Sequence, residues 1–124
     1  MQDLADSSKP VSELFSTDVA SAPRLPNDAV QQFERDGFVV GPSVLNDVQI
    51  QQLRDELAEL TDPEHDGREL WYEYNSNESA DPNLVLFHAL GAWRLRPGFH
   101  DVLWNPAFTV PASQLLGGSV RFWH

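Results

Sequence analysis

The stretch DVQIQQLRDELAEL, residues 47–60, carries the clearest secondary-structure signal in the sequence. Its apolar residues recur at steps of three or four and therefore share one face of a helix, opposite glutamine, arginine and acidic residues. They are Ile50, Leu53, Leu57 and Leu60. Asn46 precedes the stretch, and Gln49 follows Asn46 at the spacing of a capping box. The sequence predicts an amphipathic helix whose polar side, including Glu56 and Glu59, faces water.

Upstream of this helix, the sequence predicts a shorter helix and an interrupted strand. Asn27 has the side chain of an N-cap for the run DAVQQFERD, and Gly37 supplies the left-handed residue that ends a helix. FVVGPSVL, residues 38–45, is rich in β-branched and aromatic residues but contains a Gly-Pro pair, so we expect an edge strand or a bent strand. Residues 1–26 show no sustained periodicity, and we expect a disordered or extended leader.

Downstream of the helix, strands and helices are both expected. ELWYEYN, residues 69–75, predicts a strand, whereas LVLFHALGAWRL, residues 84–95, fits a buried helix or a pair of strands, of which we favour the helix. Asn105 before Pro106 is an N-cap followed by proline at the first helical position, so we predict a helix that runs to the next pair of glycines. SVRFWH, residues 119–124, predicts the beginning of a final strand. The fold class is therefore α+β.

The composition limits the classes of protein that the chain can represent. With 124 residues and 41% hydrophobic content, the chain has material for one modest domain. The net charge of −11 repels a phosphate backbone, and the few basic residues form no cluster, so we expect no nucleic-acid partner. No apolar run approaches the roughly 20 residues that cross a bilayer, and the first residues lack the features of a secretory signal. We therefore expect a cytoplasmic protein without a membrane span.

Any metal site in this chain must use histidine and carboxylate ligands, because the sequence has no cysteine. The His-Asp pairs at residues 65–66 and 100–101 lack the spacing of a chelate, so we expect solvated loop and helix-cap roles. His88 lies among apolar residues and is predicted to be packed, with one hydrogen-bonded nitrogen. The aromatic residues of the second half fit a core or sheet-covering role better than a substrate mouth. They are Trp71, Tyr72, Tyr74, Trp93 and Trp104.

The order of these elements resembles the beginning of a known enzyme family. FERDGFVV, residues 33–40, is followed by the leucine-rich helix after Asn46, then by a helix that ends in LLGG and by the strand VRFWH. Over residues 27–124 the chain resembles the N-terminal portion of the phytanoyl-CoA dioxygenase family. The resemblance implies the helical and early-strand part of a double-stranded β-helix, the jelly-roll or cupin-like fold of these enzymes.

The resemblance also implies a chemistry. Enzymes of this family bind non-haem Fe(II) through a His-x-Asp pair at the end of a core strand and a distant second His, and they use 2-oxoglutarate. His124 is similar to the first His of the pair, which makes it the candidate metal ligand of this chain. Two imidazoles and one carboxylate occupy one face of an octahedral iron and leave three positions for the oxo-acid and dioxygen. Residues two apart on a strand face the same way, so the His and the Asp converge on one ion.

The other residues of the family pattern, the Asp, the second His and the arginine for 2-oxoglutarate, have no counterpart in the sequence. We therefore expect a truncated N-terminal fragment, inactive alone, of a parent dioxygenase that hydroxylates a small or lipid-like organic substrate with dioxygen. Two alternatives stay open. One is an acidic helical interaction module whose Leu53, Leu57 and Leu60 stripe docks on a partner protein, and the other is a truncated product without function.

Overall fold

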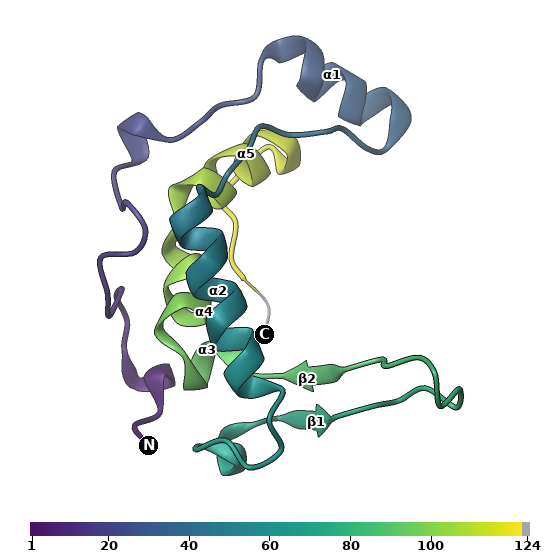
Figure 1. Cartoon of the computed structure of the whole chain (residues 1–124). Helices are drawn as coiled ribbons and strands as arrows, with labels where there is room; N and C mark the ends of the chain where they lie inside the picture. Colours follow the sequence, from purple (N-terminus) through teal and green to yellow (C-terminus); the bar gives the residue numbers. More distant parts are fainter. Residues whose placement is uncertain (123–124) are drawn as a thin grey trace.

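The computed structural model describes residues 1–122, and its helices form a layer along which the N-terminal residues lie (Figure 1). The α-helices are α1 (Asn27–Asp36), α2 (Asp47–Leu60), α3 (Ala92–Leu95), α4 (Pro97–Asp101) and α5 (Pro106–Leu116). The 3-10 turns are η1 (Leu4–Asp6), η2 (Val19–Ser21), η3 (Arg68–Leu70) and η4 (Val102–Trp104). The strands are β1 (Glu73–Asn75) and β2 (His88–Leu90). Helix α4 packs against both α2 and α3, and α1 contacts α5.

The ends of the longer helices follow the sequence signals. The Asn46 side chain accepts a hydrogen bond from Gln49 N (2.9 Å) and the Gln49 side chain accepts one from Asn46 N (3.0 Å), so the predicted capping box of α2 is confirmed. Gly37, with φ of 80°, ends α1, and Gly117, with φ of 68°, ends α5. The Asn105 side chain caps α5 as predicted. Helix α1 differs in one detail, because its N-cap position precedes Asn27.

Three predicted elements differ in the structure. Residues 38–45 form no strand, because none of their backbone groups is hydrogen-bonded to another described residue. The helix predicted for residues 84–95 is wrong. This stretch contains β2 and then α3, separated by Gly91 with φ of 113°, a conformation that interrupts a helix. Residues 119–122 form no strand within the described part, and residues 123–124 lie outside it.

The sheet is a hairpin that projects from the helices (Figure 1). Strands β1 and β2 are antiparallel, with Glu73 opposite Leu90 and Asn75 opposite His88. The strand predicted for residues 69–75 is confirmed at its C-terminal end, where β1 lies. Helices with a small antiparallel sheet make the described part of the chain an α+β arrangement. The double-stranded β-helix remains a proposal, because this sheet has two strands.

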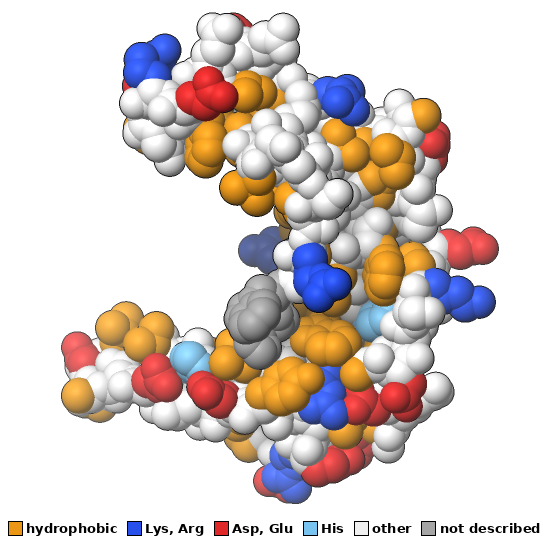
Figure 2. Space-filling view, turned by 180° about the vertical axis from the view of Figure 1, so that it is seen from behind, with side chains coloured by type: hydrophobic (Ala, Val, Ile, Leu, Met, Phe, Trp, Pro, Cys, Tyr) orange, Lys and Arg blue, Asp and Glu red, His pale blue; other side chains and the backbone are white. Residues whose placement is uncertain are grey.

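Little of the apolar surface is buried within residues 1–122. The large apolar side chains that are buried are Phe15, Leu25, Leu60 and Leu95. Seen from behind, the molecule is hollowed between the end that carries α1 and the projecting hairpin, and apolar side chains gather along the hollow (Figure 2). None of the helices described in residues 1–122 combines the length and the apolar character that crossing a bilayer requires.

Residues 1–25, which we name the strap, run along the helical layer from α3 towards α5 (Figure 1). The turn η1 contacts α3, and the turn η2 contacts α5. At the far end of the strap, Leu25 N donates to the side chain of Gln114 (2.8 Å), and the same side chain donates to Leu25 O (2.9 Å). Outside its two short turns, the strap has no regular secondary structure.

Candidate functional site

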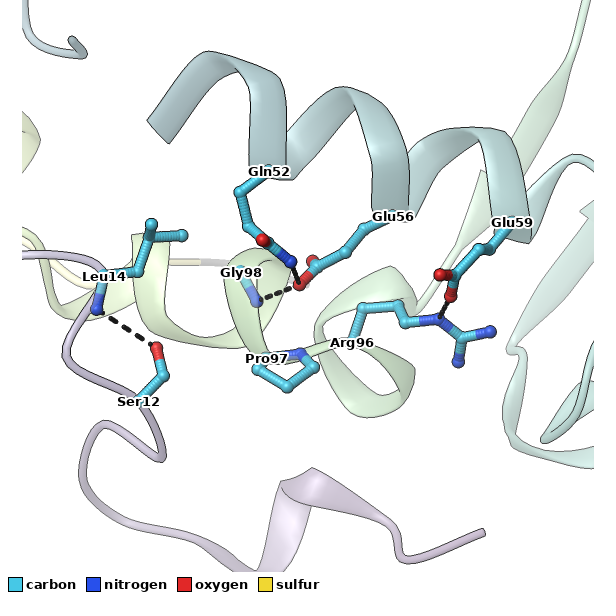
Figure 3. Close-up of a pocket in the computed structure, with 8 residues that line it drawn as sticks. All are labelled: Ser12, Leu14, Gln52, Glu56, Glu59, Arg96, Pro97 and Gly98. Carbon is cyan, nitrogen blue, oxygen red and sulfur yellow. Dashed lines mark hydrogen bonds and ion pairs between the residues drawn. The ribbon is translucent and has the colours of Figure 1, made fainter. Parts of the chain in front are cut away.

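A pocket of about 450 Å³ lies between α2, the beginning of α4 and the strap (Figure 3). Gln52, Glu56 and Glu59 of α2 line one side of it. Because they are four and three positions apart, these residues share one face of the helix. Ser12 and Leu14 of the strap line the opposite side. The pocket is therefore built by segments that are far apart in the sequence.

Glu56 is the buried acidic group of this pocket. Its side chain accepts hydrogen bonds from the backbone N–H groups of Gly98 (2.9 Å) and Phe99 (3.2 Å) and from the side chain of Gln52 (2.9 Å). The two backbone groups belong to the first turn of α4, where N–H groups lack a partner in the helix and negative charge is favourable. With 4% of the residue exposed, the prediction that Glu56 faces water is wrong. This face of α2 is covered by α4, a contact that helical periodicity alone does not reveal.

Gly98 allows this close approach of helix and carboxylate. A Cβ atom at this position would lie 2.6 Å from Glu56 Oε2 and 3.0 Å from Glu56 Cδ. Real Cβ atoms do not come so close to a neighbouring atom. Any larger residue would therefore displace the Glu56 carboxylate from the backbone N–H groups that donate hydrogen bonds to it. The residue without a side chain is thus required by the contact between α2 and α4.

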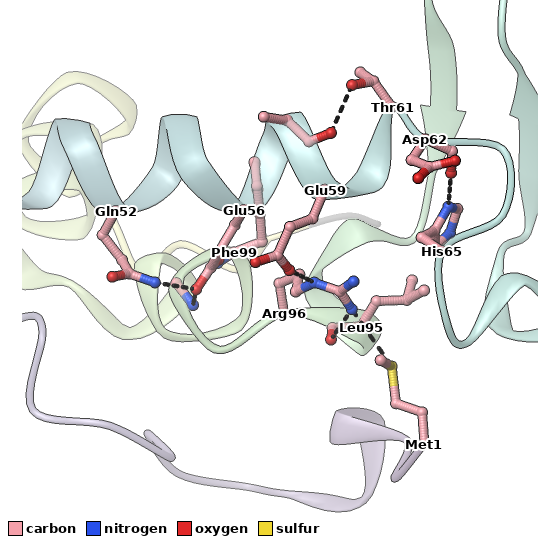
Figure 4. A network of polar contacts seen from close by, with 12 residues as sticks. Met1, Gln52, Glu56, Glu59, Thr61, Asp62, His65, Leu95, Arg96 and Phe99 are labelled. Atoms are coloured by element: carbon pink, nitrogen blue, oxygen red, sulfur yellow. Dashed lines mark hydrogen bonds and ion pairs between the residues drawn. The ribbon is translucent and has the colours of Figure 1, made fainter.

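The remaining charges of the pocket are paired. Arg96, which is almost fully buried, donates through Nε to Glu59 Oε2 (2.8 Å) and through Nη1 to Leu95 O (3.0 Å). The same guanidinium reaches Met1 Sδ of the strap (3.5 Å), as Figure 4 shows. Each carboxylate of the pocket therefore has a donor within the protein. The arrangement is suited to holding α2, α4 and the strap together.

A second polar cluster joins α4 to the strap. His100 and Asp101 are each 1% exposed, so the solvated roles expected for this pair are wrong. His100 Nδ1 lies 2.7 Å from Asp101 Oδ1. The other Asp101 oxygen accepts from Ser12 N (2.7 Å) and Ser12 Oγ (2.5 Å), and Val11 N donates to Oδ1 (2.8 Å). Burial alone raises the pKa of Asp101, but the hydrogen bonds from Ser12, His100 and Val11 outweigh it and hold that pKa below its ordinary value.

The other predicted His-Asp pair separates in the structure. His65 is buried, and its Nδ1 lies 2.5 Å from Asp62 O (Figure 4). Its Nε2 faces the indole nitrogen of Trp71 at 2.8 Å. Because the indole N–H can only donate, Nε2 accepts and Nδ1 carries the hydrogen in this arrangement. Tyr74 packs against both rings. The solvated role predicted for His65 is wrong, whereas Trp71 and Tyr74 form a packed aromatic group as predicted.

Outside these clusters, three of the predicted positions are at least partly exposed: His88, Tyr72 and Trp104, the last with 42% of the residue exposed. His88 is not packed among apolar residues but lies half-exposed on the hairpin, with Nε2 3.1 Å from Glu73 and Nδ1 3.7 Å from Glu78. The alternation of β2 explains this placement, because it turns His88 towards Glu73 on the opposite strand. Tyr72 is half-exposed, and the guanidinium of Arg94 lies 4.8 Å from its ring.

The candidate metal ligand His124 lies outside the described residues. Within residues 1–122, no three His, Cys, Asp or Glu side chains come together as a metal ion would need. The residues that the structure describes do not by themselves fit an iron centre. The groups that sequence reasoning missed are Glu56 and Asp101, and the signal for Glu56 is the Pro97-Gly98 start of a helix, whose free amides need an acceptor.

Comparison of the chain with protein-family models found no match, and comparison with curated proteins found none. The phytanoyl-CoA dioxygenase family therefore remains a resemblance carried by the quoted residues.

Proposed function

We propose that the chain forms the helical and early-strand part of a non-haem Fe(II)- and 2-oxoglutarate-dependent dioxygenase of the phytanoyl-CoA dioxygenase type. The complete enzyme would be cytoplasmic and would hydroxylate a small or lipid-like organic substrate with dioxygen. The proposal is supported by the resemblance of residues 33–60, FERDGFVV followed by the capped leucine-rich helix, to the opening of that family.

The structural observation that supports it best is the exposed segment between α1 and α2. Phe38 is 64% exposed and Val40 is 87% exposed, although both belong to a run with strong β propensity. Residues 38–45 make no backbone hydrogen bond to another described residue. An apolar run with free backbone groups is the kind of segment that a neighbouring strand covers. A double-stranded β-helix packed on this side would supply such a strand.

The proposed role of residues 1–122 is structural. The carboxylates of the pocket are occupied by amides and by Arg96, and the described residues do not fit an iron centre. The iron ligands of the proposed enzyme would thus lie outside this part, with His124 as the ligand that the resemblance implies. Iron with 2-oxoglutarate would supply the oxidising chemistry, while α2 and α4 would form a rigid layer behind the sheet.

The test starts from the product of the complete coding sequence. Purified protein is given Fe(II), ascorbate, 2-oxoglutarate and oxygen, and succinate is measured by NMR, with omission of iron as the control. The proposal expects iron-dependent formation of succinate by the complete product. A reading frame that adds no further iron ligands, or a complete product that forms no succinate with any organic acid or lipid substrate tested, would overturn it.

A pair of substitutions tests whether the exposed segment of residues 38–45 is covered in the complete enzyme. Val40→Asp should leave the stability of the 124-residue chain unchanged, because Val40 is exposed there, but should lower the yield of folded complete enzyme, in which a strand would cover it. Val19→Asp, at another exposed valine outside the segment, is the matched control. Equal effects of the two substitutions in the complete enzyme would contradict the proposed cover.

A second candidate function is the acidic interaction module. Leu60 is fully buried inside the chain, but Ile50 and Leu57 of the same stripe stay partly exposed on α2. An exposed pair of this kind fits a contact with a partner protein. Replacing Ile50 and Leu57 together by Asp would abolish such binding without changing succinate formation by the complete product, and this separates the two proposals.

A further inference from the structure

The strap is held to the helical layer mainly by side chains that accept or donate hydrogen bonds to it. The Asp101 carboxylate accepts hydrogen bonds from the backbone N–H groups of Val11 and Ser12. Gln49 Nε2 donates to Leu14 O (3.0 Å). Near the N-terminus, Arg94 pairs with Asp3. Phe15 and Leu25 are the large apolar residues of the strap that are buried. The attachment therefore combines separate polar contacts with two buried apolar side chains, both of which lie outside residues 7–14.

Asp101 is, with His100, the most deeply buried of the side chains that hold the strap. Three donors of the strap converge on one buried carboxylate, from Val11 N, Ser12 N and Ser12 Oγ. His100, the neighbouring residue of α4, approaches the same carboxylate and places its other ring nitrogen 3.4 Å from Ser7 O of the strap. Hydrogen bonds to an ionised acceptor are stronger than neutral ones, and a carboxylate has the lone pairs to accept all of them.

The part of the strap that Asp101 holds is also a wall of the pocket. Ser12 and Leu14 close the side of the pocket that faces Gln52 and Glu56 (Figure 3). The other walls of the pocket, formed by α2 and α4, contact each other directly, because Glu56 of α2 accepts hydrogen bonds from the amides of Gly98 and Phe99. These hydrogen bonds between α2 and α4 do not involve the strap.

We propose that residues 7–14 of the strap form a detachable cover of this pocket, fastened by the Asp101 carboxylate. When the fastening is lost, the cover leaves α4 while α2 and α4 stay packed, and the pocket opens to solvent. This cover goes beyond the proposed enzyme function and does not depend on it, because it involves only residues 7–14 and the helices α2 and α4.

Hydrogen exchange measured by mass spectrometry on the 124-residue chain tests the proposal. Asp101→Asn keeps the shape of the side chain but replaces one carboxylate oxygen by an NH2 group. One accepting oxygen then remains for the strap donors, which use both oxygens of Asp101. We expect the amides of residues 11–14 to exchange at least roughly tenfold faster in this variant, while peptides from α2 and α4 keep their protection. Asp55→Asn, which changes an exposed aspartate of α2 that bonds only within its own helix, is the matched control.

Ser12→Ala is the milder variant, because it removes one donor of the three and leaves Asp101 charged. It should speed exchange of residues 11–14 by less than Asp101→Asn does, again without changing α2 and α4. Unchanged exchange of residues 11–14 in Asp101→Asn would overturn the proposal. Loss of protection in the strap and the helices together, in both variants, would also overturn it, because the cover would then not be separable from the layer.

Discussion

Replacing Glu56 by Gln tests whether the contact between α2 and α4 is held by a buried carboxylate. The change keeps the size of the side chain and removes its charge. The amide oxygen of Gln can take the place of Oε1, which accepts from Gly98 N and from Gln52. The amide nitrogen then takes the place of Oε2 and faces Phe99 N, which is also a donor. One backbone N–H is left without a partner.

The size of the effect follows from these three bonds. Losing one hydrogen bond to a charged acceptor in a buried site costs about 1 to 3 kcal/mol, and weakening two others from charged to neutral costs up to about 1 kcal/mol each. Relief of the buried charge offsets part of this loss. We expect the free energy of unfolding to fall by about 2 to 3 kcal/mol, a large share of the stability of any small domain.

The assay is urea unfolding followed by tryptophan fluorescence, with sucrose in the buffer to keep the variants folded at zero urea. The matched control is Glu59→Gln, the same change three residues along α2, where the carboxylate is largely exposed and pairs with Arg96. Gln at position 59 keeps an oxygen that can accept from Arg96 Nε, and water screens the exposed Glu59 carboxylate, so we expect a loss of at most about 1 kcal/mol. If the two variants lose the same stability within about 0.5 kcal/mol, the buried role assigned to Glu56 is wrong.

Three further predictions use the same unfolding assay. Gly37→Ala should lower the free energy of unfolding by about 1 kcal/mol, because Gly37 has a left-handed φ. Gly41→Ala should leave it almost unchanged, because Gly41 lies in open space and has no such φ. Equal losses in the two variants would contradict the reasoning. Trp71→Phe keeps the aromatic ring but removes the donor to His65, so it should cost about 1 kcal/mol, and no loss would exclude a role for that bond. Hydrogen bonds hold the pKa of Asp101 in the folded chain below its ordinary 3.8, so the stability that Asp101 contributes is present above that pH and is lost as the pH falls further. Asp101→Asn should therefore make the free energy of unfolding depend less on pH in this acid range. An unchanged pH dependence in the variant would contradict the reasoning.

The parts of the fold that the sequence predicts correctly depend on residues close together in the chain. The capping box of α2 needs Asn46 and Gln49, and the ends of α1 and α5 need one glycine each. These signals act within a single turn, so they can be recognised without knowledge of the neighbours in space. The same holds for Asn105 at the start of α5.

The parts of the fold that the sequence predicts wrongly depend on contacts between distant segments. Glu56 lies 42 residues from Gly98 and looks like a solvent-facing charge until α4 is placed against it. Residues 38–45 have strand propensity, but a strand also needs a partner, and none of the described residues supplies one. The sequence predicts solvated roles for His65 and His100, because nothing in their local sequence shows that Trp71 or the strap covers them.

The contact between Asp101 and the strap also sets an order of events during synthesis. Val11 leaves the ribosome long before Asp101, from which it is separated by 90 positions, so the first segment to be made is among the last to find its place. Until then, Phe15 and the other apolar residues of that segment are open to chaperones or to other nascent chains. A slow codon run or a ribosomal pause before residue 101 would lengthen this exposure.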